Sequence, residues 1–156
     1  MAVVDVSGMQ LHVSEKTAAH WPRYSYELWP DNFCGAGRGL AEKLVPDYVF
    51  ALAKVLPSWA RIINPIKIAP ACAGHDFGWE FADPTWDAFH EENHRLRTNI
   101  AVIIVAQTTP GYVRNYALRY SEVYYDVVEL VGRKIFWRLK QSQCCVIPES
   151  AEQELW

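Results

Sequence analysis

The chain has 156 residues, and its hydrophobic fraction of 51% with seven tryptophans supplies enough apolar material for one packed domain and excludes a disordered segment. Charged residues make up 21% and the formal net charge is -3, so the composition does not predict binding to nucleic acid. Residues 1–8 lack both a basic region and a long apolar run, so they are not expected to act as a secretory signal.

The first part of the chain is expected to be irregular over residues 1–28, because apolar residues and prolines mix there without a sustained period. A first helix is predicted from Pro46 to Leu56, since proline suits the first turn of a helix. Pro57 then ends it. Its apolar residues share one helical face: Val49, Leu52, Ala53 and Leu56.

Three further helices follow in the second half of the chain. One is predicted from Pro70 to between Trp79 and Phe81. The next begins after Asp83, a plausible N-cap, and continues to about Gln107. The residues Thr108-Thr109-Pro110-Gly111 break the pattern, and the last helix is predicted over about 113–140 with a kink near Gly132.

Two motifs contain the candidate catalytic and metal-binding residues. The first is the glycine-rich stretch Asn32-Phe33-Cys34-Gly35-Ala36-Gly37-Arg38-Gly39, whose glycines allow backbone carbonyls to turn inward. The second is Ala71-Cys72-Ala73-Gly74-His75-Asp76-Phe77-Gly78-Trp79, which places a base beside a hard oxygen ligand. Taken alone, the first is most simply a turn and the second an incidental pair. Together they indicate a calcium-assisted hydrolytic site.

These two stretches resemble the phospholipase A2 family, which has a calcium loop of the form Cys-Gly-x-Gly-Gly and a helix of the form Cys-x-x-His-Asp-x-x-Tyr. The His-Asp-Phe-Gly-aromatic form is most similar to the bacterial and fungal branch, and the resemblance covers about residues 29–132. It implies a mainly α fold, with a core of two antiparallel helices, a calcium loop and a further C-terminal helix. The expected organisation is one domain over 1–156, made of an irregular segment 1–28, the phospholipase-like core 29–140 and a tail 141–156.

The resemblance also implies a function, which is calcium-dependent hydrolysis of the sn-2 ester of phospholipids at a membrane surface. His75 would be the general base that activates water, and the Asp76 carboxylate would bind Ca²⁺. Asn32 falls where the bacterial branch has an acidic ligand, so its contact with the ion would be weak. Backbone carbonyls would complete much of the coordination shell: those of Phe33, Gly35 and Gly37.

The four cysteines include one pair with a functional rationale. Spacing alone does not define a bridge, but the resemblance implies a disulfide between Cys34 and Cys72 that ties the loop to the helix. The other two, Cys144 and Cys145, are adjacent and cannot easily bridge each other. A Cys34–Cys72 disulfide would imply a secreted protein.

The chain departs from the family at the residue that orients the histidine. The family has an aspartate there, whereas this chain has Arg97, which has only hydrogen-bond donors and cannot accept the imidazole N–H. Asn99 is the best local substitute if the register shifts by two, and Thr98 is a weaker one. Two interpretations therefore remain, an esterase and a catalytically impaired phospholipase-like module that binds lipid or protein.

A zinc site is a third interpretation. His90 and His94 are four residues apart on one helix and would bind Zn²⁺ together with His75 or Asp76, although exposed histidines are the simpler explanation. Four tryptophans form either a lipid-facing cluster or, more simply, part of the core: Trp29, Trp79, Trp86 and Trp137.

Overall fold

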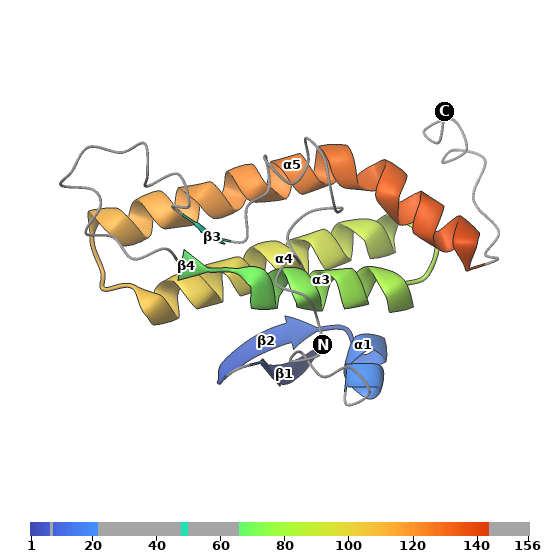
Figure 1. Ribbon diagram of the computed structural model, residues 1–156, viewed down its shortest axis with the longest axis horizontal. Helices are drawn as coiled ribbons and strands as arrows, with labels where there is room; N and C mark the ends of the chain where they lie inside the picture. Colours follow the sequence, from blue (N-terminus) through green and yellow to red (C-terminus); the bar gives the residue numbers. More distant parts are fainter. Residues whose placement is uncertain (7, 22–47, 50–65, 144–156) are drawn as a thin grey trace.

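Three long helices form most of the described structure, which is a computed structural model (Figure 1). They are α3 (Ala69–Phe81), α4 (Trp86–Gln107) and α5 (Tyr112–Ser142). Successive helices run in opposite directions, and α5 covers one side of the α3–α4 pair while an N-terminal hairpin covers the other. The predicted mainly helical fold is confirmed at this level. The structure describes residues 1–6, 8–21, 48–49 and 66–143.

The helix boundaries follow local sequence signals, with one correction. Pro70 lies in the first turn of α3, where its missing N–H costs no hydrogen bond. Asp83 is not the N-cap of α4. Thr85 takes that role because its hydroxyl accepts a hydrogen bond from the Ala88 N–H at 3.2 Å. Asp83 instead forms an exposed ion pair with Lys16 at 2.6 Å. Figure 1 shows α5 bending in its C-terminal part, although it is a single helix.

The irregular start expected over residues 1–28 is wrong for most of its first twenty residues. Strands β1 (Ala2–Val6) and β2 (Met9–Val13) pair antiparallel, with Val6 opposite Met9. Gly8 lies in their turn with a φ of 81°, a value that favours glycine. A short helix, α1 (Glu15–His20), follows. The alternation that defines the hairpin is visible in its buried residues: Val4, Val6, Leu11 and Val13.

The hairpin is fastened to the helices by Asn99 of α4. The Asn99 side chain accepts a hydrogen bond from the His12 N–H at 2.7 Å and donates one to the His12 carbonyl at 2.8 Å. Both backbone groups of β2 at this position are thereby satisfied at the helix surface. Asn99 is buried, with 1% of its surface exposed, and it therefore has a structural partner rather than His75.

Replacing Asn99 with leucine is expected to lower the free energy of unfolding by about 1–3 kcal/mol, because it leaves two partly buried backbone groups of His12 without partners. Chemical denaturation measures this loss. Thr98→Ala is the matched control on the same helix, since Thr98 is exposed and bonds only to the carbonyl of His94 in its own helix. Equal stabilities for the two variants would show that Asn99 does not fasten the hairpin.

A second, very short strand pair joins residues distant in sequence. Strand β3 (Tyr48–Val49) pairs antiparallel with β4 (Ile66–Lys67), which leads directly into α3. The helix predicted over 46–56 is therefore wrong at residues 48–49, where a pairing with β4 overrides the local helical pattern. The remainder of that predicted helix lies outside the described residues.

The core has two parts. The larger lies between the hairpin, α3, α4 and the first half of α5. The smaller is aromatic and contains Trp79, Phe89, Phe136 and Trp137. Trp79 and Trp137 are therefore core residues with Trp86 packed against them, not parts of a lipid-facing cluster, while Trp29 lies outside the described residues. A Cβ on Gly132 would lie 2.6 Å from the Trp79 ring, which explains a glycine there. Within the described chain, no helix is long and apolar enough to cross a membrane.

Candidate functional site

His75 lies on the side of α3 that faces α4 and is buried, with only 5% of its surface exposed. Its Nε2 lies 2.8 Å from Oδ1 of Asn93 on α4. Its Nδ1 lies 3.4 Å from Oδ1 of the neighbouring Asp76. The imidazole also packs against the indole of Trp79, one helical turn further along, with ring centroids 4.2 Å apart. Each ring nitrogen of His75 thus has a defined polar neighbour.

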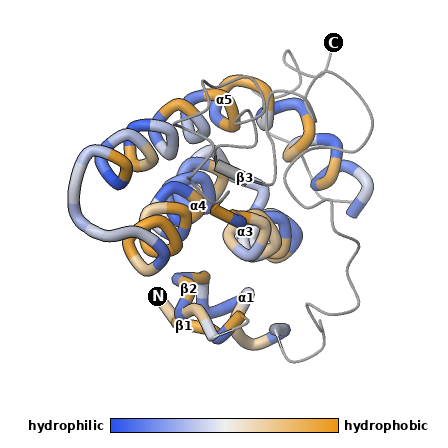
Figure 2. The backbone as a smooth tube through the Cα atoms, turned by 60° about the vertical axis from the view of Figure 1, so that its left-hand side comes forward, coloured by the Kyte–Doolittle hydropathy of each residue, from blue (hydrophilic) through white to orange (hydrophobic). Residues whose placement is uncertain are grey.

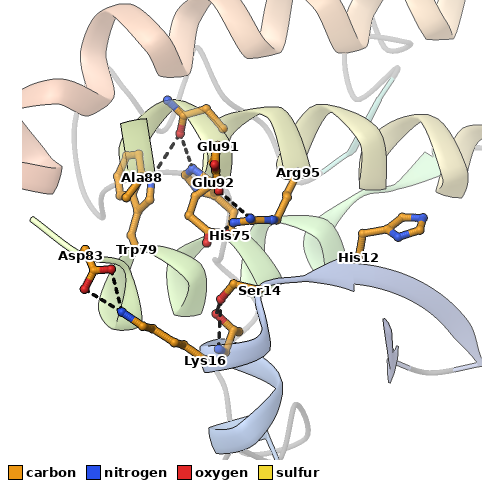
Figure 3. Close-up of polar contacts among 12 residues, drawn as sticks. His12, Ser14, Lys16, His75, Trp79, Asp83, Ala88, Glu91, Glu92 and Arg95 are labelled. Atoms are coloured by element: carbon orange, nitrogen blue, oxygen red, sulfur yellow. Dashed lines mark hydrogen bonds and ion pairs between the residues drawn. The ribbon is translucent and has the colours of Figure 1, made fainter. Parts of the chain in front are cut away.

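The neighbours of Asn93 determine which nitrogen of His75 carries the proton. Trp79 Nε1–H, which only donates, lies 3.1 Å from Asn93 Oδ1. Glu129 Oε1 accepts a hydrogen bond from Asn93 Nδ2 at 3.0 Å. The amide therefore has one orientation, and the atom that faces His75 is an acceptor. His75 Nε2–H must donate to it, which leaves a lone pair on Nδ1 in the neutral ring. Figure 3 labels His75 and Trp79 and draws these two bonds as dashed lines that meet at one acceptor oxygen.

The expectation that residue 97 or 99 orients His75 is wrong, because the acceptor is Asn93. Arg97 lies on an exposed part of α4, where its Nε donates to Glu122 at 2.9 Å and its guanidinium lies over the ring of Tyr125. A sequence signal for Asn93 exists, since it interrupts the buried stripe of α4: Phe89, Asn93, Leu96 and Ile100.

Glu129 of α5 holds the far end of this polar chain. Its side chain is 15% exposed and accepts a hydrogen bond from His90 Nδ1 at 2.8 Å in addition to the one from Asn93. Burial alone would raise the pKa of Glu129, but the hydrogen bonds from Asn93 and His90 and the charge of His90 lower the pKa below its ordinary value of 4.5. The carboxylate is therefore stabilised in its charged form.

Replacing Glu129 with glutamine is expected to cost about 1 kcal/mol of stability at neutral pH, since hydrogen bonds to a charged group are stronger than those to a neutral one. Because the folded-state pKa of Glu129 is lowered, its contribution is present above about pH 4.5 and is lost as the pH falls through the folded-state pKa. The difference between variant and wild type should therefore shrink in acid. Urea denaturation at several pH values measures it, with Glu122→Gln, an exposed ion-pair partner, as the control. A difference independent of pH would contradict this assignment.

Glu92 is a second buried acid beside the site. Its side chain is 4% exposed, forms an ion pair with Arg95, and packs on Gly78 of α3. A Cβ on Gly78 would lie 2.7 Å from Cδ of Glu92, so the glycine of the His-Asp-Phe-Gly stretch makes room for this carboxylate. Burial raises the pKa of Glu92, and the charge of Arg95 opposes that rise.

Asp76 is the accessible carboxylate of the site, with 44% of its side chain exposed. Despite that exposure, desolvation by nearby protein raises the pKa of Asp76. When His75 is protonated on both ring nitrogens, the hydrogen bond from its Nδ1–H and the positive charge of the ring oppose this rise. As a carboxylate, it supplies a hard oxygen ligand suited to Ca²⁺. Protons would compete with such an ion at low pH.

The remaining calcium ligands expected from the sequence lie outside the described residues, so the calcium site stays a prediction. Cys34 lies outside them as well, so the expected disulfide between Cys34 and Cys72 also stays a prediction. Among the residues that are described, no group of three or more His, Cys, Asp or Glu side chains is placed to hold a metal ion. The zinc interpretation gains no support there, because His90 bonds to Glu129 while His94 stacks on Tyr125. The expected ligands outside the described ranges are Asn32, Phe33, Gly35 and Gly37.

Comparison of the chain with models of protein families, with curated proteins and with solved structures found no match. A function for the chain is therefore argued from its own residues. The best-defined chemical feature among those described is the buried series His75–Asn93–Glu129, which joins α3, α4 and α5.

Proposed function

We propose that the chain is a calcium-dependent hydrolase of the phospholipase A2 type that cleaves the sn-2 ester of phospholipids. The observation that carries the proposal is the way Asn93 holds His75, with Nε2–H donated to the amide and the Nδ1 lone pair on the side of Asp76. A histidine in this tautomer has the arrangement that a general base requires.

The residues of the chain have separate roles in this proposal. His75 Nδ1 accepts a proton from water as the water attacks the ester carbonyl. Asn93 keeps the ring in one orientation, and Glu129 fixes the amide of Asn93. The Asp76 carboxylate, with carbonyls of the glycine-rich loop, would hold Ca²⁺, and the ion when bound polarises the ester carbonyl and stabilises the charge that develops on its oxygen. Because Asn93 is neutral, it orients the imidazolium without the charge stabilisation that an aspartate would add.

Calcium binding is expected to be weak, with a dissociation constant of roughly 10⁻⁴–10⁻³ M, because Asp76 is the one strong anionic ligand in the proposed site. Asp76→Ala should abolish both calcium binding in calorimetry and calcium-dependent release of fatty acid from phospholipid vesicles. Asp87→Ala, which removes an exposed carboxylate from the first turn of α4, is the matched control. Unchanged binding in Asp76→Ala would place the ion elsewhere.

The burial of His75 favours a second candidate function. A ring that is 5% exposed has little access for water or substrate in this conformation, as expected for a catalytically impaired module that binds lipid or a protein partner without turnover. Fatty-acid release separates the two candidates. A rate that is calcium-dependent and lost in a His75 variant supports the hydrolase, whereas vesicle binding without release supports the module.

A further inference from the structure

Helix α5 carries a second apolar stripe on the side away from α4. Four of its residues are substantially exposed, namely Val113 (36%), Tyr116 (53%), Val123 (57%) and Leu130 (77%). Tyr120 and Val127 lie between them and are half-buried. Figure 2 shows hydrophobic residues recurring along this helix. The surface that faces the rest of the protein is centred on other residues, which include Ala117, Ser121 and Tyr124, and the half-buried Tyr120 and Val127 also pack against the core at its edge.

The residues of this stripe have the spacing of the apolar core positions in a two-helix coiled coil. Its positions 113, 116, 120, 123, 127 and 130 alternate steps of three and four residues. A repeat of three and four keeps apolar residues on one narrow line along a helix, the arrangement with which two helices pack side by side. Scattered exposed apolar residues need no explanation, but a continuous line over this length indicates a partner helix.

The charges beside the stripe indicate that the partner is a second copy of the same helix in the antiparallel direction. Arg119 and Asp126 are exposed, lie seven residues apart on one flank of the stripe, and have no ion pair within the described part of the chain. In an antiparallel pair these flanking positions face each other, so each Arg119 meets the partner's Asp126. In a parallel pair the same positions would face the opposite flank, where the corresponding residues are Ala117, Tyr124 and Val131.

The apolar positions agree with the same direction. When Tyr120 lies opposite the partner's Val123, Tyr116 lies opposite the partner's Val127 and Val113 opposite the partner's Leu130. Every position of the stripe then meets an apolar residue. We infer that two copies of the chain associate through an antiparallel pairing of α5 along this stripe, an interaction separate from the His75 site.

The experiment is a measurement of molar mass by light scattering on the full chain, from about 1 µM to about 1 mM. The mass of the wild type should rise toward twice that of one chain, and Leu130→Asp should stay at the mass of one chain across the range. Val105→Asp is the matched control, because Val105 is 47% exposed but lies on α4. Far-UV circular dichroism verifies that each variant is folded.

A charge exchange tests the direction of pairing. Arg119→Asp should raise the concentration at which half the chains are dimeric by roughly fivefold, since it replaces two attractive contacts with repulsive ones. Adding Asp126→Arg to that variant should restore the wild-type value. A wild-type protein that remains monomeric at every concentration overturns the inference, and so does a dimer whose formation is unaffected by Leu130→Asp. A monomeric protein that binds phosphatidylcholine vesicles, and loses this binding in Leu130→Asp, also overturns the inference and assigns the stripe to a lipid surface.

Discussion

Replacing Asn93 with leucine is expected to lower the free energy of unfolding by roughly 2–5 kcal/mol. This loss is larger than the one expected for Asn99→Leu, the other amide substitution on α4. Leucine is similar in size but accepts no hydrogen bond, so His75 Nε2–H and Trp79 Nε1–H would lose their acceptor in a buried site. Glu129 would lose a donor at the same time. Unsatisfied buried donors cost about 1–3 kcal/mol each, so the loss of the shared acceptor by two donors accounts for an effect of this size.

Urea denaturation followed by tryptophan fluorescence measures this loss, and Trp79 of the site is one of the seven tryptophans that contribute to the signal. Asn115→Leu is the matched control, because Asn115 is an exposed asparagine on α5. Its stability should stay within about 0.5 kcal/mol of the wild type. A comparable, small effect for Asn93→Leu would mean that the amide does not hold the three side chains together.

Replacing His75 with alanine is expected to reduce calcium-dependent ester hydrolysis by about 10²–10⁴-fold, the usual contribution of a placed general base. His75→Gln is the more informative variant, because its amide still donates to Asn93 while offering no base. It should lose the same activity with a smaller loss of stability. Release of fatty acid from phospholipid vesicles measures the rates.

Arg97→Asp is the variant that distinguishes the two assignments of the orienting residue, Asn93 from the structure and Arg97 from the family resemblance. If Arg97 occupied the orienting position, an aspartate there would raise the rate. Because Arg97 instead pairs with Glu122 on an exposed surface, the rate should not change. Equal activities in the wild type and His75→Gln would show that any hydrolysis does not depend on this base.

The three long helices were largely predictable from the sequence, since Pro70, Pro84 and the Thr108–Gly111 break divide strongly periodic segments, whereas α1 and the strand at 48–49 were not. The hairpin was not, because β1 and β2 have only five residues each and show the two-residue alternation weakly beside Gly8. Its attachment through Asn99 joins residues 87 positions apart in sequence, which no local pattern encodes.

The candidate site was predictable only in part, because some of its contacts also join residues that are distant in sequence. The sequence identifies His75 and Asp76 as neighbours, and the structure places their side chains in contact. The orienting residue depends on how α3 and α4 pack, which determines the turn of α4 that faces His75. The family resemblance pointed to Arg97, one turn beyond Asn93. The polar interruption of an otherwise apolar stripe at Asn93 was the signal that would have corrected it.

The protonation of the His75 ring is the most direct test of the central claim, that Asn93 fixes this histidine with its proton on Nε2. Nitrogen-15 NMR of the imidazole distinguishes the two tautomers without any assumption about substrate or metal. In its neutral form, His75 should carry its proton on Nε2 and none on Nδ1, and Asn93→Leu should abolish that preference. A spectrum in which neutral His75 carries its proton on Nδ1 would contradict the account.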